Sequence, residues 1–134
     1  ATRDLARVAA AHDRLRIAID HFGLEGRLDA AGLDEAAREL ERAASLPNLG
    51  VKASALPLHV DEPFPFPSLH DPLRRVVAAF GPDRVFWGSD MSRHGPSYRA
   101  ALAWVREVDG LGDDALAWVL GRGIRRWLGL ERPG

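Results

Sequence analysis

The sequence contains no cysteine among its 134 residues. This absence excludes disulfide bridges, thiolate nucleophiles and cysteine-type zinc sites, and it leaves histidine and carboxylate side chains as metal ligands. The sequence also has no apolar run close to the roughly 18 residues that cross a bilayer. Its first residues lack the basic-then-apolar layout of a signal peptide. We therefore expect a cytoplasmic protein with no membrane partner.

An excess of charge of one sign is missing as well. The formal net charge is −1, and the arginines are spread along the whole chain. Because no basic stripe is present that would follow a phosphate backbone, we expect no nucleic-acid partner. The hydrophobic content of 46% is enough to build a core, and the length fits one ordinary domain over residues 1–134.

The apolar residues follow two patterns along the chain. Helical spacing occurs in residues 3–12, 33–44, 71–80, 97–108 and from 113 onward, where Gly121 and Gly123 are expected to kink the last helix. Asp71 followed by Pro72 predicts a capped helix start. Near-continuous apolar runs at 15–20, 49–56 and 84–90 predict strands that are buried on both faces. The Pro-rich residues 56–67 between them predict a long, stiff loop.

This order of helices and strands predicts an α/β fold with a parallel sheet. Parallel strands expose unpaired backbone groups at both edges of a sheet, and three strands make a thin sheet. We therefore expect another chain, or a segment that this sequence does not contain, to cover the edges.

Each predicted strand ends in polar residues, where an α/β sheet places its active face. Asp20 and His21 follow the first strand, Lys52 and Ser54 lie in the second, and Asp90 follows the third. Asp90 is the strongest candidate, because it follows an apolar run in which Gly88 allows close backbone approach and Ser89 can orient a carboxylate. Alternatives remain: Asp90 as a helix cap, His21 as a loop cap, and Lys52 as an ion-pair partner of Asp20 or Asp90.

Four segments together resemble one known family. RVFWGSDMSR is similar to the strand-eight segment of the amidohydrolase-related family that includes pyrone-dicarboxylate hydrolases, sugar lactonases and aminocarboxymuconate-semialdehyde decarboxylases. IAIDHFG resembles the family's strand that ends in Asp-His, LPNLGVKASAL its Pro-Asn and Val-Lys segment, and ALAWVLGRGIRRWLGL its closing helix. The four segments occur in the family's order and cover nearly the whole chain.

The resemblance implies a partial (β/α)8 TIM barrel, made of the last three strand–helix units plus a C-terminal helix. It implies that Asp90 takes a proton from the attacking water, and that His21 binds a metal or polarises the substrate carbonyl. Asp90 also touches the metal in metal-containing members. Arg93, Lys52 and Ser54 are the candidate substrate-binding residues. The implied cofactor is a divalent metal, Zn or Mn, and a metal-free mechanism is the alternative.

The sequence also departs from the family pattern. The His-x-His of the family's first strand is missing here, Met91-Ser92 replaces the usual Trp-Pro, and Ala55 stands where the strand usually ends in Gly. Two implied metal ligands are therefore absent. Of the other histidines, His59 in the Pro-rich loop could reach the active face, although a solvated loop residue is the favoured interpretation, and His94 is a weaker candidate for a ligand or an acid.

We therefore predict a hydrolase in which water attacks a lactone, ester or amide carbonyl of a small organic acid. A decarboxylase of the same family is one alternative. The other is a non-catalytic half-barrel that needs a partner, either the missing half of the barrel or further copies of itself. A phosphate-binding domain is disfavoured, because no Gly-rich loop joins a strand to a helix.

Overall fold

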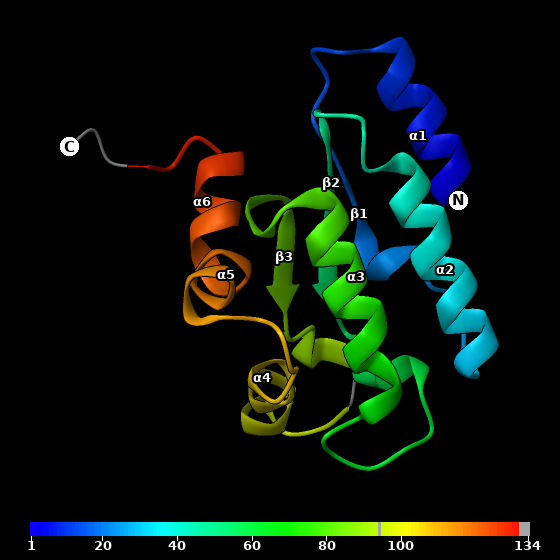
Figure 1. Ribbon diagram of the computed structural model, residues 1–134, viewed down its shortest axis with the longest axis vertical. Helices are drawn as coiled ribbons and strands as arrows, with labels where there is room; N and C mark the ends of the chain where they lie inside the picture. Colours follow the sequence, from blue (N-terminus) through cyan, green and yellow to red (C-terminus); the bar gives the residue numbers. More distant parts are fainter. Residues whose placement is uncertain (94, 132–134) are drawn as a thin grey trace.

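The computed structural model describes residues 1–93 and 95–131 and shows an α/β fold around a parallel sheet (Figure 1). The sheet has three strands in the order β1-β2-β3, which span Ile17–Ile19, Leu49–Ser54 and Val85–Gly88. Residues 17–19 pair with 49–51, and residues 51–54 pair with 85–88. The predicted parallel sheet and its strands are confirmed.

The first three helices lie on the same side of this sheet. They are α1 (Thr2–Ala11), α2 (Ala30–Ala43) and α3 (His70–Phe80), and each contacts the next one in the chain (Figure 1). In a doubly wound fold, helices cover both faces of the sheet. Here the connections wind in one direction and cover one face, which is the winding that a barrel uses.

The remaining helices follow β3. They are α4 (Tyr98–Arg106), α5 (Asp113–Ala117) and α6 (Gly123–Trp127), and a π-type turn at Trp118–Arg122 joins the last two. Gly121 interrupts the helical backbone in this turn, and a Cβ atom on Gly123 would lie 2.9 Å from the carbonyl oxygen of Asp83. The predicted kink is confirmed at Gly121, whereas Gly123 is helical and begins α6.

Side chains of β2 alternate between the two faces of the sheet. Leu49, Val51 and Ala53 belong to the core that the helices cover, so Gly50, Lys52 and Ser54 point to the other face. Phe86 of β3 covers Gly50, where a Cβ atom would come within 2.8 Å of its ring. Gly50 is therefore required for the ring of Phe86 to lie over β2.

The start of α3 differs from the prediction. The helix begins at His70, because a short 3-10 turn at Pro67–Leu69 runs directly into it, and Leu69 occupies the cap position. Asp71 lies inside the first turn and contacts Arg74 instead of capping the helix. The Pro-rich loop is a loop as predicted, although it also contains a 3-10 turn at Leu56–His59.

Candidate active site

The exits of all three strands share a backbone feature. Residues in the left-handed region follow each strand: His21 and Phe22 after β1, Ala55 after β2, and Asp90 after β3, with φ between 48° and 56°. This conformation costs a residue with a side chain roughly 1–2 kcal/mol. Such residues concentrate at functional sites, where the surrounding structure holds them in place. The backbone therefore marks the carboxyl edge of the sheet as the candidate site.

His21 and Asp90 come together at this edge, as predicted. The distance from His21 Nε2 to Asp90 Oδ2 is 3.5 Å, and each side chain is 24% exposed. The two residues leave β1 and β3, so they meet across the end of β2. The site therefore brings together residues from the two outer strands of the sheet.

Ser54 holds the imidazole of His21 from behind. His21 Nδ1 lies 2.8 Å from Ser54 Oγ and 3.1 Å from the carbonyl oxygen of Ser54. Because a carbonyl oxygen only accepts, Nδ1 carries a proton, and this contact directs Nε2 toward Asp90. Ser54 itself is buried, at 3% exposure. Its position fits a support for His21 better than the predicted contact with substrate.

Asp90 is oriented by a hydroxyl that the sequence interpretation missed. Ser92 Oγ donates to Asp90 Oδ1 at 3.3 Å, whereas the sequence pattern pointed to Ser89 for this task. The pattern did place Gly88 correctly, because a Cβ atom there would lie 3.1 Å from Ser54 Cβ. A larger residue at this position would press on the support of His21.

Lys52 lies in β2, two residues before Ser54 and on the same face of the sheet. Its Nζ atom is 2.6 Å from Asp20 Oδ1, so the predicted pairing with Asp20 is confirmed. Both side chains are well exposed on the face of the sheet that α1–α3 leave uncovered. The pair places a positive and a negative charge on that face of the sheet.

Two predicted site residues lie wholly or partly outside the described part of the structure. Arg93 ends the short turn Met91–Arg93, and its side chain lies outside the described part of the structure. His94 also lies outside the described residues. The roles expected for these residues stay predictions.

The prediction for His59 is wrong. The residue is 3% exposed instead of solvated, and its ring centroid lies 6.3 Å from that of His21. Its Nδ1 atom donates to the carbonyl oxygen of Gly26 at 2.6 Å, which draws the loop inward. The sequence signal was an aromatic polar residue in a loop stiffened by prolines, and it did not indicate where the loop lies.

The described residues offer an incomplete set of metal ligands. Over residues 1–93 and 95–131, no group of three or more histidine or carboxylate side chains is arranged to hold a metal. His21 Nε2 and Asp90 are a nitrogen and an oxygen donor on one side of a gap, which suits a divalent ion in kind. A catalytic zinc site takes three protein ligands plus water, so these two residues provide part of such a site.

A cavity of about 220 Å³ adjoins Asp90. It lies between the exits of β2 and β3 and the helix α4, and its walls are mostly apolar. They include Ala53, Leu56, Trp87, Asp90, Met91 and Trp104. A small organic molecule near Asp90 therefore has apolar surface within reach.

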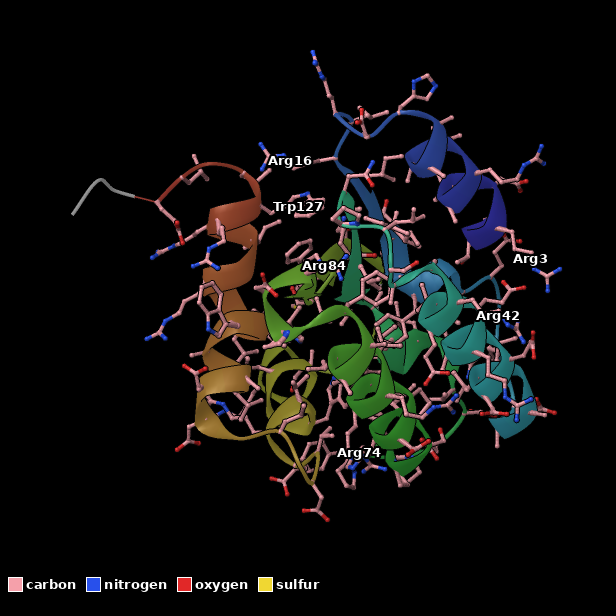
Figure 2. The ribbon with its side chains drawn as sticks, turned by 45° about the horizontal axis from the view of Figure 1, so that its top comes forward. Arg3, Arg16, Arg42, Arg74, Arg84 and Trp127 are labelled. Carbon is pink, nitrogen blue, oxygen red and sulfur yellow. The ribbon has the colours of Figure 1, made fainter. Side chains whose placement is uncertain are left out.

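The far end of the sheet has a different character. Figure 2 shows Arg16 beside Trp127, the last residue of α6, and Arg16 donates to the carbonyl oxygen of Trp127. Arg84, also labelled there, donates to the carbonyl oxygens of Ala44, Leu46, Leu49 and Phe80 at 2.7–3.0 Å. Burial lowers the pKa of the Arg84 guanidinium, although Asp83 opposes this shift. We therefore assign a structural role to this end of the sheet.

In the described part of the chain, every helix falls short of the length and apolar character that crossing a bilayer demands.

The chain is similar to known proteins of one family. A family model described as amidohydrolase matches residues 2–130. The chain is 34% identical over 140 residues to the L-fucono-1,5-lactonase of Burkholderia ambifaria, an alignment that covers 96% of this chain and 47% of that protein.

Solved structures show the same relation. The chain resembles a crystal structure of an amidohydrolase from Burkholderia multivorans with bound zinc, with a TM-score of 0.80 and 22% identity. A crystal structure of an amidohydrolase from the same organism with bound HEPES gives 0.79 and 23%. Both matches cover 96% of this chain and 49% of the other. The chain thus spans about half the length of these relatives.

Proposed function

Since this chain belongs to the amidohydrolase family, we propose that it contributes the last three strand–helix units of a (β/α)8 barrel hydrolase. The one-sided winding of α1–α3 supports this assignment, because a barrel keeps all its helices outside the sheet. The half-length match to the relatives supports it as well. On this proposal, residues from the rest of the barrel would face Lys52 and Asp20.

The proposed reaction is attack of water on the carbonyl of a small lactone, ester or amide. Asp90 takes a proton from the water as its oxygen bonds to the carbonyl carbon, and it returns that proton to the leaving oxygen or nitrogen as the old bond breaks. Ser54 fixes His21 so that Nε2 faces the reacting carbonyl: in the metal-free route a protonated Nε2 donates to the carbonyl oxygen, and in the metal route the Nε2 lone pair would hold the ion. The observation that carries the proposal is the approach of His21 Nε2 to within 3.5 Å of Asp90 Oδ2.

A divalent metal would be held by His21 Nε2 and Asp90, together with ligands from the rest of the barrel. When bound, it would supply Lewis-acid polarisation of the carbonyl and a more acidic water. A metal-free route with the same two residues is the alternative. The name of the Burkholderia ambifaria relative supports a sugar lactone as substrate over a decarboxylation.

The test is the hydrolysis of a panel of sugar lactones, followed as acid release at constant pH. We expect Asp90→Asn to lower kcat by a factor of about 10²–10⁴ with the same thermal stability, because it removes a base without changing volume. Asp4→Asn, an exposed substitution in α1, serves as the control and is expected to leave the rate unchanged. Equal rates for Asp90→Asn and wild type would exclude Asp90 as the base.

A second function rests on the edges of the sheet. Among the described residues, β1 and β3 pair with β2 alone, so each presents one open edge. On this view the chain is an assembly module that covers its edges with a complementary half-barrel or further copies. Sedimentation velocity separates the two proposals: a stable monomer that hydrolyses lactones contradicts the assembly module, and an inactive oligomer supports it.

A further inference from the structure

We propose that His59 is a positioning residue: it ties the loop after β2 to the loop after β1 and thereby keeps His21 directed at Asp90. This inference rests on the proposed function for the importance of His21. The contacts that support it are independent of any activity. Its test below reads the state of the His21 ring and needs no turnover.

His59 joins the two loops through a donor and an acceptor. Its Nδ1 atom donates to the carbonyl oxygen of Gly26 at 2.6 Å, and its own carbonyl oxygen accepts from the backbone nitrogen of Leu28 at 2.8 Å. Arg27 adds a bond from its guanidinium to the carbonyl oxygen of Val60 at 3.3 Å. Residues 26–28 are therefore held by residues 59 and 60 along their whole length.

The segment that these bonds restrain is the turn that carries His21. His21, Phe22 and Gly23 take left-handed φ values of 51°, 56° and 67° in succession. A run of left-handed residues is unfavourable for side-chain-bearing residues and needs external contacts to persist. Ser54 restrains the turn through the His21 ring. His59 restrains the residues that follow the turn.

The ring of His59 also borders the ring of His21 directly. Their centroids are 6.3 Å apart with an angle of 37° between the planes, and His59 is buried. The His21 ring thus lies against both Ser54 and His59. If the loop bond is lost, we expect the turn to relax and His21 Nδ1 to leave the carbonyl oxygen of Ser54, which is the contact that selects its tautomer.

Three substitutions separate the loop bond from simple packing. His59→Asn keeps an N–H donor near the place of Nδ1, His59→Gln moves the donor toward the place of Nε2, and His59→Phe keeps the ring shape without any donor. A positioning role through Nδ1 predicts that Asn preserves the state of His21, whereas Gln and Phe do not. A packing role predicts that Phe preserves it best.

The experiment uses the chain labelled with ¹⁵N-histidine and long-range proton–nitrogen NMR in mildly alkaline solution. In wild type we expect widely separated His21 nitrogen shifts, the signature of a single tautomer with the proton on Nδ1. His59→Phe and His59→Gln are expected to lose this signature, so that the two nitrogen shifts converge, and His59→Asn to retain it. His70→Phe is the matched control, because His70 also contacts a backbone carbonyl, that of Pro65, and is expected to leave His21 unchanged.

Several results would overturn the proposal. A folded His59→Phe chain with an unchanged His21 signature would do so, as would loss of the signature in His59→Asn to the same extent. An equal change in the His70→Phe control would also contradict it. If His59→Phe does not fold, the comparison of Asn with Gln decides the question. If the His59 result holds and lactone hydrolysis is absent, the proposed function fails and this inference stands.

Discussion

The two ends of the same three strands are built in opposite ways. Where the strands begin, polar side chains donate to backbone carbonyl oxygens: Arg16 before β1, Asn48 before β2, and Arg84 before β3. Asn48 alone contacts the carbonyl oxygens of Ala9, His12 and Leu15. Where the strands end, the backbone turns through left-handed residues, and the polar groups face one another.

One end of the sheet thus stabilises the fold, and the other end carries the candidate site. Asn48 and Arg84 satisfy carbonyl groups in buried or half-buried surroundings, and Arg16 adds an exposed contact, so these donors stabilise that end. At the other end, the chain accepts unfavourable backbone conformations in order to bring His21 and Asp90 together. The comparison predicts that the strand beginnings carry much more of the free energy of unfolding than the strand exits.

The largest expected effect is at the beginning of β3. Arg84→Met removes a half-buried charge that donates to four carbonyl oxygens, and we expect it to lower the free energy of unfolding by about 3 kcal/mol. Urea unfolding at neutral pH measures the change. Arg74→Met is the control; its exposed ion pair with Asp71 contributes less than about 1 kcal/mol. A similar loss in the two variants would contradict the comparison.

An intermediate effect is expected between α2 and α3. It tests whether contacts between these helices, instead of the contacts at the strand beginnings, stabilise the fold. Arg75 of α3 donates to Asp34 and Glu41 of α2 at 2.6–2.8 Å. These hydrogen bonds lower the pKa of both carboxyl groups below their usual values, although burial opposes the shift. The same bonds raise the pKa of Arg75.

The direction of the pH effect follows from these shifts. Carboxyl groups with a lowered pKa contribute stability above their unfolded pKa, near 4, and this stability is lost as the pH falls through the folded pKa. We expect Arg75→Met to lower Tm by a few degrees at neutral pH, and by much less near pH 3. Thermal unfolding followed by circular dichroism measures both values. The control is Arg42→Met, which loses the exposed pair with Glu35. The amount by which it lowers Tm is expected to differ less between neutral pH and pH 3. If Arg75→Met lowers Tm by the same amount at both pH values, the stability does not come from the pairing of Arg75 with these carboxylates.

The smallest expected effect is at the exit of β2. Ala55 is buried with φ 56°, so Ala55→Gly removes roughly 1 kcal/mol of backbone strain. It loses a similar amount through the greater freedom of glycine in the unfolded chain. We expect the urea midpoint to change little, whereas Ala78→Gly on the exposed face of α3 is expected to cost about 1 kcal/mol. Equal losses in both variants would show that Ala55 is not strained.

Periodicity was sufficient to predict the strands, the helices and the parallel sheet. It also predicted that His21 and Asp90 would meet, because the carboxyl ends of parallel strands lie at one edge. It did not predict the burial of His59, the donors of Arg84 or the hydroxyl of Ser92. Each of these depends on where a loop or helix end lies in space, and the spacing of apolar residues carries no information about that. The resemblance pointed to Ala55 as a departure, and the structure supplies the physical meaning in its left-handed φ.

The ring of Phe86 over Gly50 has a consequence for how the site is tuned. A methyl group at position 50 would push that ring aside, and it would also lie 3.3 Å from the carbonyl oxygen of Arg84, just before β3. Asp90 lies only four residues further along the same strand and its exit. A substitution at residue 50, which does not line the cavity, is therefore expected to reach Asp90 through the backbone of β3.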